Sequence, residues 1–142
     1  MRPLKLTMSA FGPYSSVEVI DFADLRSRNL FLITGPTGSG KTTIFDAISY
    51  ALYGKASGDL RTEENLRSHF SDPSLLTEVS LVFELNEVQY EVHRIPKQMR
   101  PKARTEGFTE QKPDATLTMK LGESSTVIVG VSKVNKQIES IP

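Results

Sequence analysis

Apolar and polar side chains alternate in several short stretches of this chain, and the alternation predicts β-strands. The stretches pair off as three hairpins, formed by residues 4–11 with 17–22, 77–85 with 88–95, and 116–121 with 126–131. Residues 30–33 are apolar throughout, which is typical of a strand that is buried on both faces. The pattern therefore predicts a sheet built mainly from hairpins, with one fully buried strand.

Two stretches have helical periodicity instead. Residues 41–53 place Ile44, Ile48 and Leu52 on one face, and Gly54 ends the helix. Residues 132–141 form the second predicted helix, with Ser132 as its N-cap.

Two further segments lie between these elements. A short helix is possible near residues 62–69, and the prolines and charges of residues 96–113 predict a long, mobile loop. The predicted order is β-β-β-α-β-β-β-β-α, an α/β chain of the α+β kind with a mixed sheet and one crossover helix.

Composition narrows the class of protein. The chain has 142 residues, enough for one domain, and its 17 Lys+Arg balance 17 Asp+Glu, so any nucleic-acid contact must come from a local basic patch. It contains no cysteine and only two histidines, which excludes thiolate metal sites and thiol catalysis. Apolar runs are far shorter than the roughly 20 residues that cross a bilayer, and we expect a cytoplasmic protein with no membrane partner.

A phosphate-binding motif stands between the buried strand and the first helix. It matches G-x-x-x-x-G-K-[ST] at every position, with Gly35, Pro36, Thr37, Gly38, Ser39, Gly40, Lys41 and Thr42. Glycines let successive N–H groups point toward phosphate oxygens, and the helix N-terminus adds a positive dipole. Lys41 is expected on the β- and γ-phosphates, and the Thr42 hydroxyl is expected to hold Mg²⁺.

Hydrolysis needs more than this motif. An acidic residue at the end of a second buried strand must complete the Mg²⁺ shell and orient water. The nearest candidate is Glu84, which we interpret as a solvated strand position because the alternation continues past it. No Leu-Ser-Gly-Gly motif follows either, so the chain carries at most half of an ATPase site.

The residues around the motif resemble a known family. Phe11-Gly12-Pro13-Tyr14 precedes it, and the run from Ile44 to Gly54, ending in Tyr-Gly-Lys, follows it. This combination is similar to the N-terminal lobe of the SbcC-type exonuclease subunit, an SMC-like ATPase of double-strand break repair. The resemblance covers residues 1–142.

The resemblance implies an ABC-type ATPase head of which residues 1–142 are the N-terminal lobe only. In that family the C-terminal lobe is separated by a long coiled coil, and two heads close on two ATP molecules as a homodimer beside an SbcD-type nuclease subunit. Residues Gly35 to Thr43 would carry over as the ATP and Mg²⁺ cradle, and Phe11–Tyr14 would lie near the base. Arg61 is placed like an arginine that reaches the nucleotide, although an ordinary loop charge fits it as well.

A basic stretch lies in the second half of the chain. Five cations and no acid occur between residues 92 and 105, namely Arg94, Lys97, Arg100, Lys102 and Arg104. Such a loop, spanning residues 94–104, can neutralise phosphates without reading sequence. We expect contact with duplex DNA here, a role that the resemblance supports; a merely solvated loop is the alternative.

Two other functions stay open at this point. The chain could be a small, self-contained P-loop phosphotransferase, or a module that binds nucleotide or DNA without turnover. The first would need a second substrate site and a lid after the helix, where residues 55–73 supply only Arg61 and Arg67. The intact ATPase would instead couple ATP binding and hydrolysis to the processing of DNA ends, with this chain alone not catalytically competent.

Overall fold

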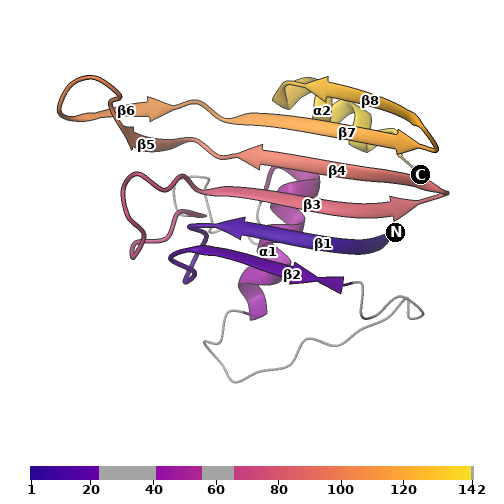
Figure 1. Ribbon diagram of the computed structural model, residues 1–142, viewed down its shortest axis with the longest axis horizontal. Helices are drawn as coiled ribbons and strands as arrows, with labels where there is room; N and C mark the ends of the chain where they lie inside the picture. Colours follow the sequence, from indigo (N-terminus) through magenta and orange to yellow (C-terminus); the bar gives the residue numbers. More distant parts are fainter. Residues whose placement is uncertain (23–40, 56–65, 142) are drawn as a thin grey trace.

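A six-stranded sheet forms the main layer of the molecule (Figure 1). The computed structural model describes residues 1–22, 41–55 and 66–141. The spatial order of the strands is β2 (Val17–Asp21), β1 (Arg2–Ser9), β3 (Glu78–Leu85), β4 (Val88–Ile95), β7 (Asp114–Leu121) and β8 (Ser124–Val129). All five pairings in this sheet are antiparallel. The three predicted hairpins are thereby confirmed.

The turns explain why these strands pair in this register. Asn86 and Glu87 connect β3 to β4 with positive φ angles of 53° and 70°, and Gly122 begins the β7–β8 turn at φ 58°. Two-residue turns with positive φ match the twist of the strands they join. Leu85 consequently pairs with Val88, and Leu121 with Ser124.

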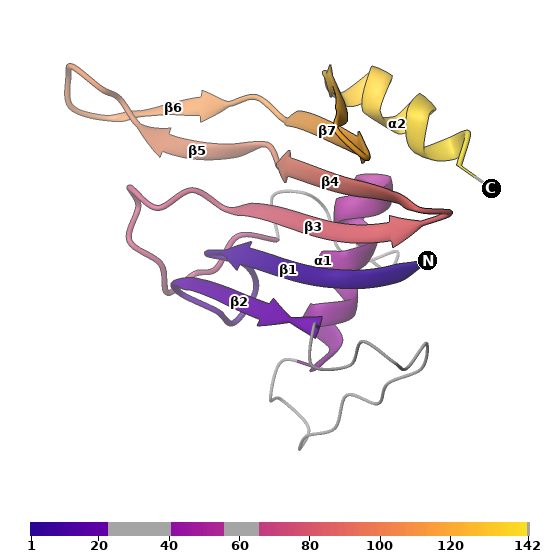
Figure 2. The same ribbon diagram turned by 45° about the vertical axis from the view of Figure 1, so that its right-hand side comes forward.

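Both described helices cover the same face of the sheet (Figure 2). Leu81, Val92 and Leu117 are aligned across β3, β4 and β7, and each is 0% exposed. Helix α1 (Lys41–Tyr53) and helix α2 (Val131–Glu139) pack on this apolar row and close the core. Helix α1 has the bounds that the sequence predicts.

The opposite face of the sheet carries small and polar side chains. Thr7, Ser80, His93 and Thr116 form a row across four strands. Beside them, Nε2 of His93 lies 3.5 Å from Oε2 of Glu78. No helix in the described part of the chain covers this face, which agrees with the alternating pattern of the strands.

The segment predicted as a long loop is in fact a second sheet. Strands β5 (Gln98–Pro101) and β6 (Phe108–Gln111) pair antiparallel and form a hairpin that extends beyond the main sheet (Figure 1). The N–H of Lys102 donates to the carbonyl of Gly107 at 3.0 Å, and Gly107 takes φ 101°. Pro101 stands at the end of its strand, where a missing N–H is tolerated. The prolines of residues 96–113 therefore flank this structure and do not prevent it.

Helix α2 begins one residue earlier than predicted. Its N-cap is Gly130 (φ 112°, ψ 137°), whose carbonyl accepts from the N–H of Val134 at 2.9 Å, and no side chain caps it. Ser132 is therefore not the N-cap, because the positive φ of Gly130 already turns the chain from β8 into the helix.

Two predicted elements are not settled by the described residues. The strand at residues 30–33 lies outside them. Most of the possible helix at residues 62–69 also does, and its described part contains an isolated bridge between Phe11 and Arg67.

Candidate functional site

The N-terminus of α1 lies beside the turn that follows β1. Gly12 has φ 58°, and a β-carbon built onto it would lie 2.8 Å from Cγ2 of Thr43. Thr43 is 4% exposed and stands in the first turn of α1. Only a glycine lets this backbone approach the helix so closely. The Phe11–Tyr14 turn is thereby packed against the residues that complete the glycine-rich motif.

A third segment closes this corner of the molecule. The N–H of Gly12 donates to the carbonyl of Leu66 at 2.8 Å, and the N–H of Ser68 donates to the carbonyl of Ala10 at 2.8 Å. Leu66 is 1% exposed, so its side chain anchors the segment in the core. Residues 66–68 thus hold the turn from the side opposite the helix.

Most of the predicted nucleotide residues lie outside the described part of the chain. These are Gly35, Pro36, Thr37, Gly38, Ser39, Gly40 and Arg61. Lys41 and Thr42 are placed by their backbone in the first turn of α1. The N–H groups of a helix N-terminus and its dipole favour an anion, and this first turn contains no acidic residue. The helix terminus and its glycine cradle therefore fit a phosphate group.

Acidic groups are sparse in the rest of the described sheet. Glu84 is exposed on β3, as expected for a solvated strand position. Among the described residues, no three His, Asp or Glu side chains come together to hold a metal ion.

Arg94 is buried and holds the end of α1 (2% exposed). Its Nε donates to the carbonyl of Ala51 at 2.7 Å, and its Nη2 donates to the carbonyl of Leu52 at 3.2 Å and to Oδ1 of Asn135 at 2.8 Å. A β-carbon at Gly54 would lie 3.2 Å from its Nη1. Arg94 caps a helix C-terminus and is not a surface cation, so the predicted DNA contact at this position is wrong.

The other four cations of the basic stretch belong to the β5–β6 hairpin. Nζ of Lys97 lies 3.1 Å from Oε1 of Glu110, and both side chains are about half exposed (45% and 50%). Arg100 is partly buried on β5, whereas Lys102 and Arg104 are exposed in the connecting turn. The structure thus separates one internal arginine from four cations on a protruding hairpin.

A cleft of about 530 Å³ opens at the base of this hairpin. Its walls include Arg67 and His69 on one side and Lys97, Met99 and Phe108 on the other. Met99 and Phe108 are each more than half exposed. The cleft joins the hairpin to the segment that supports the Gly12 turn.

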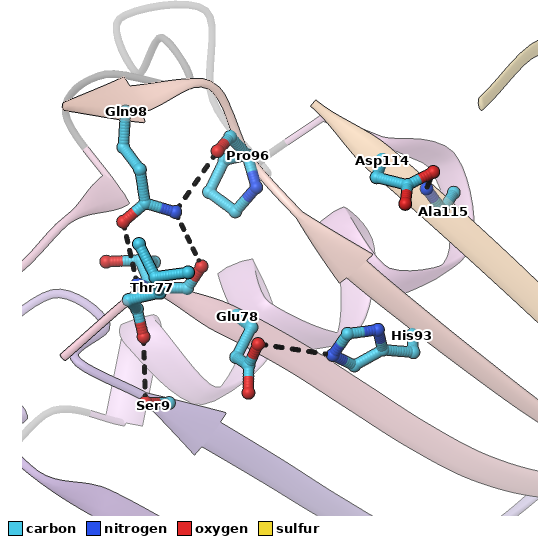
Figure 3. A network of polar contacts seen from close by, with 9 residues as sticks. Ser9, Thr77, Glu78, His93, Pro96, Gln98, Asp114 and Ala115 are labelled. Atoms are coloured by element: carbon cyan, nitrogen blue, oxygen red, sulfur yellow. Dashed lines mark hydrogen bonds and ion pairs between the residues drawn. The ribbon is translucent and has the colours of Figure 1, made fainter. Parts of the chain in front are cut away.

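Gln98 fixes the base of the hairpin through its side-chain amide (Figure 3). Its Oε1 accepts from the N–H of Thr77 at 2.8 Å, and its Nε2 donates to the carbonyl of Thr77 at 2.8 Å and to that of Pro96 at 3.2 Å. Nη1 of Arg67 donates to the same Oε1 at 3.2 Å. Gln98 and Arg67 were not predicted from the sequence, where no motif or spacing distinguishes them.

Comparisons with known proteins agree with the expected resemblance. A family described as "AAA domain" matches residues 5–140. A Vibrio cholerae serotype O1 protein, named as the SbcC component of the nuclease SbcCD, is 46% identical over 128 residues, which is 90% of this chain and 13% of that protein. A Staphylococcus aureus (strain JH9) protein of the same name is 52% identical over 94 residues, 66% of this chain and 9% of that protein. The chain therefore spans only about an eighth of the length of these relatives.

None of the described helices is long and apolar enough to cross a bilayer.

Proposed function

Because the chain belongs to the AAA domain family, we propose that it is the ATP-binding N-terminal lobe of an ABC-type ATPase head that serves a nuclease complex. The observation that carries this proposal is the close packing of Gly12 on Thr43, which joins the turn after β1 to the phosphate motif. The relatives named as part of a nuclease support the same assignment.

In this proposal the residues of the motif bind and orient the nucleotide. N–H groups of residues 35–40 surround the phosphates, Lys41 neutralises the β- and γ-phosphates, and the Thr42 hydroxyl holds Mg²⁺. Bound Mg²⁺ bridges phosphate oxygens and offsets the charge that develops during phosphoryl transfer. The Gly12 turn covers one side of the site, and Arg61 reaches the nucleotide from the loop after α1.

The remaining parts of an ATPase site come from elsewhere in the proposal. The described sheet offers no acidic cluster for a second Mg²⁺ ligand, which fits a head whose C-terminal lobe and second copy complete the site. ATP turnover in the intact protein then controls DNA end processing by an SbcD-type nuclease subunit. A self-contained phosphotransferase is less well supported, because both named relatives are nuclease subunits.

Duplex DNA is the second proposed ligand, and the β5–β6 hairpin is its contact. Lys97, Arg100, Lys102 and Arg104 lie on this hairpin, which protrudes from a chain of zero net charge. Cations on a protruding ribbon can neutralise backbone phosphates irrespective of sequence.

Nucleotide titration of the natural, full polypeptide tests the main proposal. We expect Mg-ATP to bind the wild type, and Lys41→Ala to weaken binding at least tenfold, because a phosphate-facing charge is worth about 1.5–3 kcal/mol. Lys55→Ala, which removes a cation beyond the end of the same helix, is the matched control and should bind normally. Equal affinity of wild type and Lys41→Ala would refute the assignment.

A further inference from the structure

We infer that the Thr77–Gln98 pair links the nucleotide turn to the basic hairpin, so that Gln98 is a positioning residue that couples the two proposed ligands. The inference rests on the proposed function, since it concerns how ATP and DNA influence each other. It names a route through side chains that neither ligand touches.

The link begins at the turn after β1. Gly12 is pressed against Thr43 of α1, so a displacement of the helix N-terminus must also move the turn. Two residues earlier, the carbonyl of Ala10 accepts from Oγ1 of Thr77 at 2.7 Å and from the N–H of Ser68 at 2.8 Å. Ala10 has φ 47°, an unfavourable value for a residue with a side chain, and its neighbours must hold it there.

Thr77 passes this constraint to Gln98. Thr77 is 0% exposed, and both its N–H and its carbonyl are bonded to the Gln98 amide, as Figure 3 shows. The adjacent Ser9 hydroxyl donates to the carbonyl of Leu76 at 2.9 Å and ties the end of β1 to the same strand entry. Buried polar groups with reciprocal partners resist displacement, because moving one leaves another unsatisfied.

Gln98 is also the first residue of β5. It is 6% exposed, and its partner across the hairpin is Gln111 of β6. The hairpin is not part of the main sheet, so its orientation depends on contacts at its base. Arg67 strengthens that base, because its Nη1 donates to Oε1 of Gln98 and to Oγ1 of Thr77 (3.2 and 3.4 Å). Movement at Ala10 is therefore transmitted to the strand that carries Arg100.

The test is a thermodynamic cycle on the full natural polypeptide. Duplex DNA affinity is measured by fluorescence anisotropy with and without saturating Mg-ATP, and the ratio of the two dissociation constants is the coupling factor. We expect a factor between about 5 and 150 in the wild type. Gln98→Met keeps the length of the side chain but removes all amide hydrogen bonds, and should bring the factor close to one. Thr77→Val removes the bond to Ala10 and should do the same.

Matched variants separate coupling from simple destabilisation. Thr116→Val makes the same change on the uncovered face of β7 and should leave the factor at the wild-type value. Gln98→Glu keeps an acceptor for the Thr77 N–H but cannot donate, and should give an intermediate factor. A merely structural role would lower thermal stability and leave the factor unchanged.

The possible results are distinct. A wild-type factor in Gln98→Met and Thr77→Val overturns the inference, as does a factor of one in a wild type that binds both ligands; the proposed function survives in both cases. A wild type that binds no nucleotide or no duplex refutes the corresponding part of the proposed function, and this inference with it.

Discussion

Arg94 and Arg104 stand ten residues apart in the same basic stretch, yet their surroundings are opposite. Arg94 is buried under two helices and bonded to carbonyl oxygens and an amide, whereas Arg104 is exposed in the turn of the β5–β6 hairpin. Desolvation of a guanidinium is costly unless several acceptors surround it, and here the C-terminus of α1 supplies them. A run of cations in a sequence is therefore not by itself a surface, because strand alternation can turn one of its members into the core.

The largest expected effect comes from removing the buried member. Arg94→Met should lower the free energy of unfolding by about 3 kcal/mol, since the carbonyls of Ala51 and Leu52 lose a charged donor in a buried site. The melting temperature should fall by roughly 6–12 °C in a thermal unfolding scan. Arg104→Met is the matched control and should melt with the wild type.

A partial version of this change sharpens the assignment. Asn135→Ala removes only the contact with α2 and should cost about 1 kcal/mol. If Arg94→Met melted with the wild type, the capping role described for Arg94 would be wrong.

The exposed members should matter for DNA and hardly for stability. We expect Lys102→Glu with Arg104→Glu to weaken binding to a blunt duplex about tenfold at moderate salt. The slope of log affinity against log salt should fall by about two, one for each lost phosphate contact. Lys120→Glu with Lys133→Glu changes the net charge equally and serves as the control. Equal weakening by both pairs would mean that net charge, and not the hairpin, determines affinity.

The smallest expected effect concerns Arg67, which is intermediate between these extremes. Its Nη2 donates to the carbonyl of Asp72, and its Nη1 reaches Gln98. Two hydrogen bonds from Ser74 lower the pKa of the Asp72 carboxyl below 3.8, with a smaller contribution from the charge of Arg67. A lowered pKa in the folded state stabilises the protein above the unfolded pKa, and this contribution disappears as the pH falls through the folded value.

Asp72→Asn should therefore slightly lower the urea midpoint at neutral pH. The difference from the wild type should vanish well below pH 3.8, where the wild-type carboxyl is protonated. Because the group is exposed, the effect should be small. A difference that persists in acid would show that packing, and not ionisation, is responsible.

Local patterns predicted much of this fold. The hairpins around Asn86 and Gly122 could be recognised because alternation and turn residues agree, and α1 because an apolar face follows the glycine-rich motif and Gly54 ends it. The chain's resemblance to a nuclease subunit was also recognisable, since it depends on contiguous residues around the motif.

Long-range contacts could not be predicted in this way. The β5–β6 hairpin was missed because three prolines and many charges obscure a four-residue alternation, and its base depends on Gln98 meeting Thr77, 21 residues earlier. The capping role of Arg94 depends on Ala51, 43 residues away. Neither distance has a signature in a single sequence, because tertiary packing decides which polar residue becomes internal.

The position of β1 between β2 and β3 also has a consequence for biosynthesis. Leu6 pairs with Leu81, so the N-terminal strand has no second neighbour until some 75 further residues have left the ribosome. The meander β3–β4–β7–β8 is largely local in sequence and can form first, whereas closing the loop between β1 and β3 is entropically slow. The segment that carries the phosphate motif is therefore translated early but fixed late, and its folding depends on strands made after it.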